Sequence, residues 1–299
     1  MDGEKEDLDL ILEELCKRYG IEFSLYREGT VLRRLARRLI ATGSGTYGMY
    51  RAYLGAHPGE YDLLLKDLTI KVSRFFRNRE MFDLLSETVL PGLIEARKAQ
   101  GGGTIRIWCA GCASGEEVYS VAIALMECVE MLGEDTAAVR VSIFGTDVDA
   151  DALDLARRGE YKMETLRETR PEIAGKYFSP VVLAKGATGF RVADRVRDLV
   201  HFCRHDVASE VHRSPPAGVF SGFDLILCRN VLIYFTRRLQ DRAFANLTGS
   251  LNPGGYLVLG KAEAIPDELA PVLIQQDSLK VYRKSPPPTR SATHEERKR

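Results

Sequence analysis

The sequence has no long apolar run and no net charge, and these two absences exclude several classes of protein. No apolar stretch approaches the roughly 18–20 residues that a membrane-spanning helix needs. Lys plus Arg and Asp plus Glu both total 42, so overall charge does not attract nucleic acid or anionic lipid. The first residues, MDGEKEDLDL, are acidic and polar where a signal peptide is basic and then apolar. We therefore expect a cytoplasmic protein without membrane insertion.

The cysteines lack the spacing of a metal site or of a disulfide framework. No second Cys or His pair stands at ligand spacing from Cys109 and Cys112, so we expect no metal. The stretch WCAGC is similar to a dithiol redox centre, but the preceding TIRIW makes Cys109 the end of a strand. We interpret all the cysteines as reduced and mostly buried thiols. They are Cys16, Cys109, Cys112, Cys128, Cys203 and Cys228.

The pattern along the 299 residues predicts a helical part followed by an α/β part. Residues 1–82 show helical periodicity alone, and GTVLRRLARRLIATG places apolar residues on one helix face with arginines around the rest. Residues 83–103 are expected to form a linker helix and a joint at GGG. Within residues 104–285, the β-rich runs TIRIWCA, VRVSIFGTD, FDLILCRN and GGYLVLG alternate with helical patterns, which predicts a doubly wound domain. We expect an inserted β-subdomain at 161–200 and a disordered tail at 286–299.

The stretch IRIWCAGCASGEEVYSVAIALM predicts a nucleotide-binding turn between a strand and a helix. Gly111 and Gly115 carry no Cβ and let the backbone approach a ligand, at which the following helix directs its N-terminus. Asp147, at the carboxyl end of the next strand, can accept hydrogen bonds from ribose hydroxyls. The strict G-x-G-x-x-G is missing, and Glu116 and Glu117 stand where a pyrophosphate needs neutral donors. Carboxylates there suit a ligand with a positive group, such as S-adenosylmethionine.

Four separated stretches resemble, in the same order, the CheR-type chemotaxis receptor glutamate methyltransferases. They are KVSRFFRN, WCAGCASGEEVYSVAI, GTDVD and FDLILCRNVLIYF, and the likeness runs from Arg27 to Arg283. The resemblance implies an all-helical N-terminal domain and a doubly wound S-adenosylmethionine-dependent methyltransferase domain with a small β insertion. It also implies transfer of a methyl group from S-adenosylmethionine to glutamate carboxylates of chemoreceptors in sensory adaptation, leaving S-adenosylhomocysteine.

The resemblance further implies the residues of the site. Lys71 stands where the family usually has Asn, and Gly260 and Glu263 remain from a usual Gly-His-Ser-Glu run. The arginines that match receptor-facing positions are Arg34, Arg37 and Arg38. With Gly111 of the predicted turn, the expected cofactor contacts are Lys71, Ser73, Arg77, Gly111, Glu117, Asp147, Asp206, Val207, Arg229 and Asn230.

Methylation of a glutamate carboxylate requires no general base. The nucleophile has an unperturbed pKa of about 4.3 and is ionised at neutral pH. The enzyme must align this anion with the sulfonium methyl and remove water from it. An arginine and a tyrosine hydroxyl can hold such an anion, so Arg77 and Tyr234 are the expected catalytic residues.

Three other functions remain open from the sequence. A nucleic-acid methyltransferase would use the arginine-rich helix on phosphates, but RNVLIYF replaces the Asn/Asp-Pro-Pro-aromatic motif of amino-directed enzymes. A non-catalytic S-adenosylmethionine-binding module is compatible with Lys71, and an NAD oxidoreductase is disfavoured by the carboxylates in the turn. We expect glutamate-rich receptor helices as the partner, no nucleic-acid partner, and a monomer.

Overall fold

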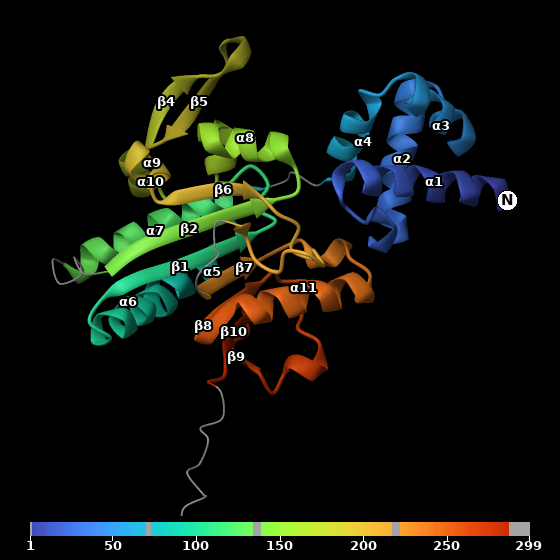
Figure 1. Cartoon of the computed structure of the whole chain (residues 1–299). Coiled ribbons are helices and arrows are strands. Elements are labelled where there is room, and N and C mark those ends of the chain that lie inside the picture. The colour runs from blue at the N-terminus through green and yellow to red at the C-terminus, as the bar shows by residue number, and fades with distance from the viewer. Residues whose placement is uncertain (1, 70–72, 134–138, 217–221, 287–299) are drawn as a thin grey trace, which may run out of the picture.

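The structure is a computed structural model that describes residues 2–69, 73–133, 139–216 and 222–286. It consists of a small helical domain beside a larger α/β domain (Figure 1). An all-helical first domain, a mixed α/β domain and a small antiparallel sheet confirm the predicted fold class. No helix in these ranges is both long and apolar enough to cross a bilayer. Apart from Pro286, the expected disordered tail lies outside the described residues.

Four helices form the N-terminal domain, and each buries one apolar side against the others. Their bounds are α1 (Asp2–Tyr19), α2 (Glu28–Thr42), α3 (Tyr47–Ala56) and α4 (Glu60–Leu68). Their common core includes the fully buried Leu15, Leu35, Tyr50, Leu54 and Leu64. On α2, Val31 and Leu35 are buried, whereas Arg33 and Arg37 are exposed. The apolar stripe predicted for this helix therefore faces the domain core.

A seven-stranded sheet forms the centre of the second domain. Its strands are β1 (Gly103–Ala110), β2 (Val139–Asp147), β6 (Val200–Arg204), β7 (Phe223–Cys228), β8 (Leu251–Leu259), β9 (Leu273–Asp277) and β10 (Val281–Lys284). Their order is β6-β2-β1-β7-β8-β10-β9, parallel from β6 to β8 and antiparallel at β10 and β9. The strand order reverses beside β1, and such a reversal leaves a ligand-binding crevice at the carboxyl ends of the strands.

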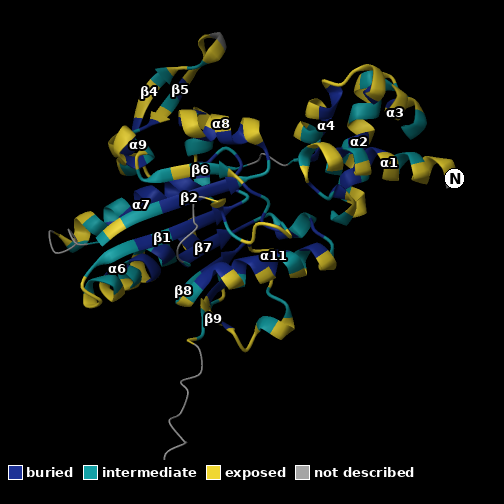
Figure 2. Cartoon of the chain, viewed as in Figure 1, coloured by how far each residue is buried: buried dark blue, intermediate teal, exposed yellow. Residues whose placement is uncertain are grey.

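Helices cover both faces of this sheet. They are α5 (Arg79–Leu84), α6 (Leu90–Ala99), α7 (Glu116–Leu132), α8 (Ala150–Arg158) and α11 (Arg237–Ser250). Side chains of β1 alternate between two apolar layers, because successive residues of a strand point to opposite faces. Ile105 and Ile107 pack with residues of α6 and α7, whereas Trp108 and Ala110 pack with residues of α11. Figure 2 shows the central strands buried and the outer sides of the helices exposed.

The inserted segment forms a second sheet of three antiparallel strands. The strands are β3 (Glu160–Lys162), β4 (Phe178–Val182) and β5 (Thr188–Val192), in the order β3-β5-β4. The short helices α9 (Pro171–Tyr177) and α10 (Asp194–Arg197) flank β4 and β5. These elements occupy most of the segment for which the sequence predicts a β-subdomain.

Apolar residues between Phe75 and Ile94 pack into the core of the α/β domain. Helix α5 runs across the expected boundary between residues 82 and 83 and continues through a π-helical turn, Leu85–Val89, into α6. The buried ring of Phe75 lies edge-on to Tyr161 and to Phe178, with 4.9 Å between ring centroids in both pairs. The stretch expected to be a linker therefore packs against the sheet, because its apolar side completes the core of the larger domain.

The helical domain contacts the α/β domain beside the 3₁₀ turn Leu232–Tyr234, which follows β7. The backbone N–H of Arg27 donates to the carbonyl of Tyr234 at 2.7 Å. The ring of Tyr26 lies edge-on to that of Phe235, 5.0 Å away between centroids. The helical domain is thereby held at the carboxyl ends of the parallel strands.

Candidate functional site

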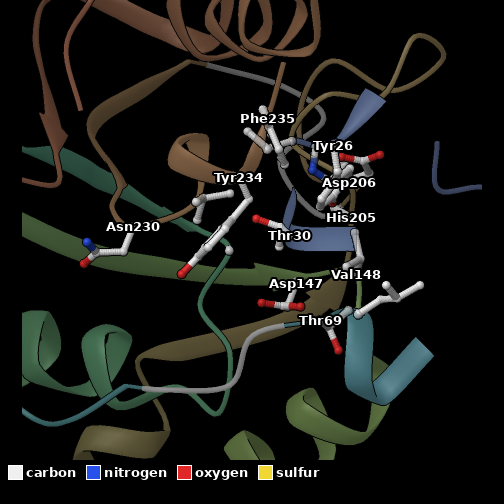
Figure 3. Close-up of a pocket in the computed structure, with 14 residues that line it drawn as sticks. Tyr26, Thr30, Thr69, Asp147, Val148, His205, Asp206, Asn230, Tyr234 and Phe235 are labelled. Carbon is white, nitrogen blue, oxygen red and sulfur yellow. The ribbon is translucent and has the colours of Figure 1, made fainter. Parts of the chain in front are cut away.

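Two adjoining cavities lie at the carboxyl ends of β1, β2 and β7. Residues from both domains line the first cavity (Figure 3), among them Tyr26, Thr30, Thr69, Asp147, His205 and Asp206. The second cavity is lined by residues that include Ser73, Arg77, Glu117 and Arg229. Gly111, Asn230 and Tyr234 line both cavities, so the two form one continuous site.

The turn after β1 brings the backbone into this site. Gly111 has a φ of 70°, and a Cβ built on it would lie 2.4 Å from Cγ2 of Val231. A side chain at this position would therefore both strain the backbone and collide with the opposite wall. The N–H of Ala113 donates to Oδ2 of Asp147 at 2.8 Å, which fixes the turn to the end of β2. The packing of the turn against Val231 therefore requires a glycine here, and close approach of a ligand to Gly111 stays a prediction.

Two half-buried carboxyl groups lie in the first cavity. Burial raises the pKa of Asp147, although backbone N–H groups, including that of Asp149 at 3.0 Å, partly offset the increase. Burial likewise raises the pKa of Asp206, whose Oδ1 accepts the N–H of Ala208 at 2.9 Å. Carboxylates placed in this way can accept hydrogen bonds from the hydroxyl and amino groups of a nucleoside.

An ion pair forms part of the wall of the second cavity. Nη1 of Arg229 lies 2.6 Å from Oε2 of Glu117, and the Arg229 side chain is 2% exposed. Nη2 of Arg229 donates to the carbonyl of Arg77 at 3.1 Å and to Oδ1 of Asn78 at 2.6 Å. Arg229 thus fixes the loop that carries Arg77 against the end of β7. Its Nε is buried and has no hydrogen-bond partner in the described part of the chain.

Glu263 holds the turn that follows β7. Its buried carboxylate accepts the backbone N–H groups of Asn230 and Gly260 on one oxygen, at 3.0 and 2.6 Å. The other oxygen accepts those of Val231 at 2.9 Å and Leu232 at 2.8 Å. These bonds stabilise Asn230 at a φ of 60°, a conformation that costs energy for a residue with a Cβ. The sequence resemblance singles out Glu263 but does not indicate this role.

The structure brings most of the predicted site residues together. Those that line the two cavities are Ser73, Arg77, Gly111, Glu117, Asp147, Asp206, Val207, Arg229, Asn230 and Tyr234. Lys71 lies outside the described residues.

The three predicted receptor-facing arginines differ in their surroundings. Arg37 is exposed on α2. Arg38 is paired with the buried Glu60 through two hydrogen bonds, of 2.8 and 2.9 Å, and its side chain is 16% exposed. Arg34 donates to the carbonyls of Asp67 and Thr69. Two of the three guanidinium groups therefore bind the helical domain itself.

Several residues that line the cavities could not be predicted from the sequence. Tyr26, Thr30 and Thr69 come from the helical domain and reach the cavity only because the two domains pack together. His205 is buried, and its Nε2 lies 2.8 Å from the carbonyl of His212. Burial lowers the pKa of His205, which therefore favours the neutral ring.

The two thiols of WCAGC are unsuited to redox chemistry. Cys109 and Cys112 are both buried, and burial raises the pKa of each thiol well above its usual value. A reactive cysteine requires a stabilised thiolate, which this environment disfavours. In the described ranges, no group of three His, Cys, Asp or Glu side chains could hold a metal ion.

A nucleoside-type pocket at the reversal point of a doubly wound sheet, with carboxylates in the glycine turn, is typical of S-adenosylmethionine-dependent methyltransferases. Comparisons with known families give the same class. The all-alpha domain of CheR methyltransferase matches residues 6–69, and its SAM binding domain matches residues 71–278. The chain belongs to the CheR methyltransferase family and is an S-adenosylmethionine-dependent methyltransferase.

Similar proteins include chemotaxis methyltransferases from several bacteria. The chain is 32% identical to the chemotaxis protein methyltransferase of Listeria innocua, over 82% of this chain and 85% of that protein. It is 32% identical to chemotaxis protein methyltransferase 2 of Pseudomonas aeruginosa, over 87% and 86% of the two chains. The chemotaxis protein methyltransferase of Escherichia coli is 31% identical over 85% of this chain and 82% of its own.

Replacement of Glu263 should disrupt the cofactor site. In Glu263→Gln, the amide NH₂ faces backbone N–H donors and leaves two of them without an acceptor, at about 1–3 kcal/mol each. We expect a lower Tm and at least a tenfold loss of affinity for S-adenosylhomocysteine, measured by thermal unfolding and calorimetry. The control is Glu268→Gln, which changes an exposed carboxylate on the same connection. Equal behaviour of the two variants would contradict the assigned role.

Glu116 should make the stability depend on pH. Its carboxyl is buried, Oε2 has no partner among the described residues, and burial raises its pKa from 4.5 to about 7. The folded state therefore binds this proton more tightly than the unfolded state, so stability present below pH 4.5 is lost as pH rises through about 7. Glu116→Gln should raise Tm at pH 8 and flatten its decline between pH 5 and 8.

The matched control for this pH series is Glu172→Gln, which removes an exposed carboxyl of α9. We expect its Tm to follow that of the wild type at every pH. A Glu116→Gln curve that runs parallel to the wild-type curve from pH 5 to pH 8 would show that Glu116 does not titrate in this range.

Proposed function

We propose that the protein transfers a methyl group from S-adenosylmethionine to glutamate side-chain carboxylates of chemoreceptors, which yields glutamate methyl esters in sensory adaptation. The observation that carries the proposal is the position of Arg77 and Tyr234. Both line the cavity that also contains Glu117 and Arg229, at the edge where the helical domain meets the sheet. A guanidinium and a phenol at one opening form a binding site for a carboxylate.

In this proposal, each of the two cavities binds one half of the cofactor. Asp147, Asp206 and Val207 would bind the adenosine half. Ser73, Glu117 and Arg229 would bind the methionine half, with Gly111 and Asn230 at the junction. The residues fit S-adenosylmethionine, since Glu117 presents a carboxylate that suits its positive groups. The buried Nε of Arg229, which has no partner among the described residues, is a donor that suits its carboxylate.

The reaction needs no proton transfer. S-adenosylmethionine, when bound, supplies a methyl group on a positively charged sulfur. A carboxylate oxygen of the substrate would attack this methyl, so that one O–C bond forms and one S–C bond breaks. The sulfur would keep the bonding electron pair and leave as the neutral thioether of S-adenosylhomocysteine. Arg77 and the Tyr234 hydroxyl hold the substrate anion and exclude water from it, which is the alignment that such a displacement requires.

Helix α2 supplies the receptor-facing surface in this proposal. Arg33, Arg37 and Ile40 are exposed on it, and Thr30 of the same helix lines the first cavity. In the described part of the chain, the side chains of Arg33 and Arg37 make no hydrogen bond or ion pair, and both are exposed. They would steer glutamate-rich receptor helices towards the opening. Arg38, which is paired with Glu60, would instead stabilise the helix.

The relatives support this choice of substrate, since they are named chemotaxis protein methyltransferases. We propose accordingly that the protein acts in the cytoplasm, where glutamate-rich receptor helices are accessible. It would act as a monomer, and nucleic acid would not be its substrate.

Base treatment of labelled product tests the proposed reaction. The purified protein would be incubated with methyl-labelled S-adenosylmethionine and a chemoreceptor cytoplasmic fragment, and the product would then be exposed to mild base. We expect the label to be released as methanol, because a carboxyl methyl ester hydrolyses in base. Arg77→Ala should abolish transfer. Base-stable label, or full activity of Arg77→Ala, would contradict the assignment.

Charge reversal on α2 tests the receptor surface. Arg37→Glu should raise the KM for the receptor fragment about tenfold, since it replaces attraction with repulsion, and leave affinity for S-adenosylhomocysteine unchanged. The matched control is Arg140→Glu, an exposed arginine at the amino end of β2 and so at the opposite end of the strand from Asp147. An equal KM for the two variants would exclude α2 as the receptor surface.

A further inference from the structure

A chain of hydrogen bonds crosses the junction between the domains and begins at Arg34 on α2. Nη1 of Arg34 donates to the carbonyl of Asp67 and, at 3.3 Å, to that of Thr69. These carbonyls belong to the last turn and the C-cap of α4, where backbone acceptors lack partners within the helix. The half-buried Arg34 therefore fixes the end of α4 against α2.

Thr69 carries the chain into the α/β domain. Its Oγ1 lies 2.8 Å from Oδ2 of Asp149, and also 3.0 Å from the carbonyl of Leu65. A hydroxyl has one hydrogen to donate, and the charged carboxylate is both the nearer and the stronger acceptor. The hydrogen therefore points across the junction, towards Asp149.

Asp149 is buried and connects this contact to the cofactor pocket. Its Oδ1 accepts the N–H of Ala152 at 3.0 Å and caps α8. Its own backbone N–H donates to Oδ1 of Asp147 at 3.0 Å. Thr69 and Asp147 both line the first cavity and, in Figure 3, lie on the same side of it. The position of Asp147 thus depends on the segment that Thr69 holds.

We propose that Thr69 is a positioning residue that connects α2 to the cofactor-binding carboxylate Asp147, through Arg34 on one side and Asp149 on the other. The connection makes receptor binding at α2 and cofactor binding at Asp147 mutually dependent. The effect on receptor binding rests on the proposed function, whereas the effect on cofactor binding can be tested with S-adenosylhomocysteine alone.

Calorimetric titration of the full chain with S-adenosylhomocysteine tests the cofactor side. Thr69→Val keeps the shape of the side chain and removes the donor, and it should weaken binding about tenfold. Thr69→Ser restores the hydroxyl and should bind within about twofold of the wild type. In the methylation assay, Thr69→Val should raise the KM for S-adenosylmethionine and leave kcat near the wild-type value.

Lys66→Met is the matched control. Lys66 forms an ion pair with Asp151 across the same junction, but both side chains are about half exposed. Its loss should change the affinity for S-adenosylhomocysteine by less than about twofold. A wild-type affinity in Thr69→Val, or an equal loss in Thr69→Ser, would overturn the proposal. If Thr69→Val does not fold, an unchanged affinity in Arg34→Gln without receptor would overturn it instead.

Titration in the presence of a chemoreceptor fragment tests the coupling. Coupling between two ligands is reciprocal, so a fragment that binds α2 should change the affinity for S-adenosylhomocysteine in the wild type. In Thr69→Val, the affinity for S-adenosylhomocysteine should be nearly the same with the fragment as without it. A fragment that binds without changing this affinity in the wild type would overturn the coupling. Failure of the fragment to bind would instead contradict the proposed function, and the titrations without receptor would stand.

Discussion

The ion pair between Arg229 and Glu117 is the interaction on which the site depends. It joins the end of β7 to the first turn of α7, and the second nitrogen of the guanidinium joins the loop that carries Arg77. A charge as deeply buried as that of Arg229 is stable only when paired, and loss of one partner of such a pair typically costs about 3–5 kcal/mol. Three segments far apart in the chain are therefore held in one arrangement by one side chain.

Strained backbone surrounds this pair, and each strained residue has a specific support. Phe76, Asn78, Ala113 and Asn230 have positive φ values without being glycine. The N–H of Phe76 donates to Oγ of Ser120 and that of Asn78 to Glu168. The N–H of Ala113 donates to Asp147 and that of Asn230 to Glu263. Residues of this kind persist only where the surroundings hold them, and they are frequent in ligand sites. The site is therefore organised by the protein before any ligand binds.

The sequence predicts those parts of the fold that depend on neighbouring residues, namely the apolar strands and the turn that joins a strand to a helix. The runs that became β1, β2 and β7 are apolar on both faces, and the glycine turn stands directly between a strand and a helix. The outer strands β6, β9 and β10 escaped prediction, since they are short and only partly buried. The expected boundary near residue 82 falls inside α5, because Phe75 and α5 complete a core whose other members lie far along the chain.

The same distinction applies to the site. Motif positions such as Asp147 and Arg229 could be found from the residues around them. Tyr26 and Thr69 line the cavity only because the helical domain packs on the sheet, and the spacing of residues along the chain does not predict that contact. Similarly, four arginines on one short helix indicate a basic surface. Only the packing of α4 shows that Arg34 and Arg38 are engaged within the domain.

The most direct test of the account compares S-adenosylhomocysteine with adenosine in calorimetric titrations of the wild type and of Arg229→Met. Arg229 lines the cavity that would bind the amino-acid half of the cofactor, whereas Asp147 and Asp206 line the other cavity. We therefore expect Arg229→Met to lose most of its affinity for S-adenosylhomocysteine and to retain its affinity for adenosine. Equal losses for both ligands, or no loss for either, would contradict it.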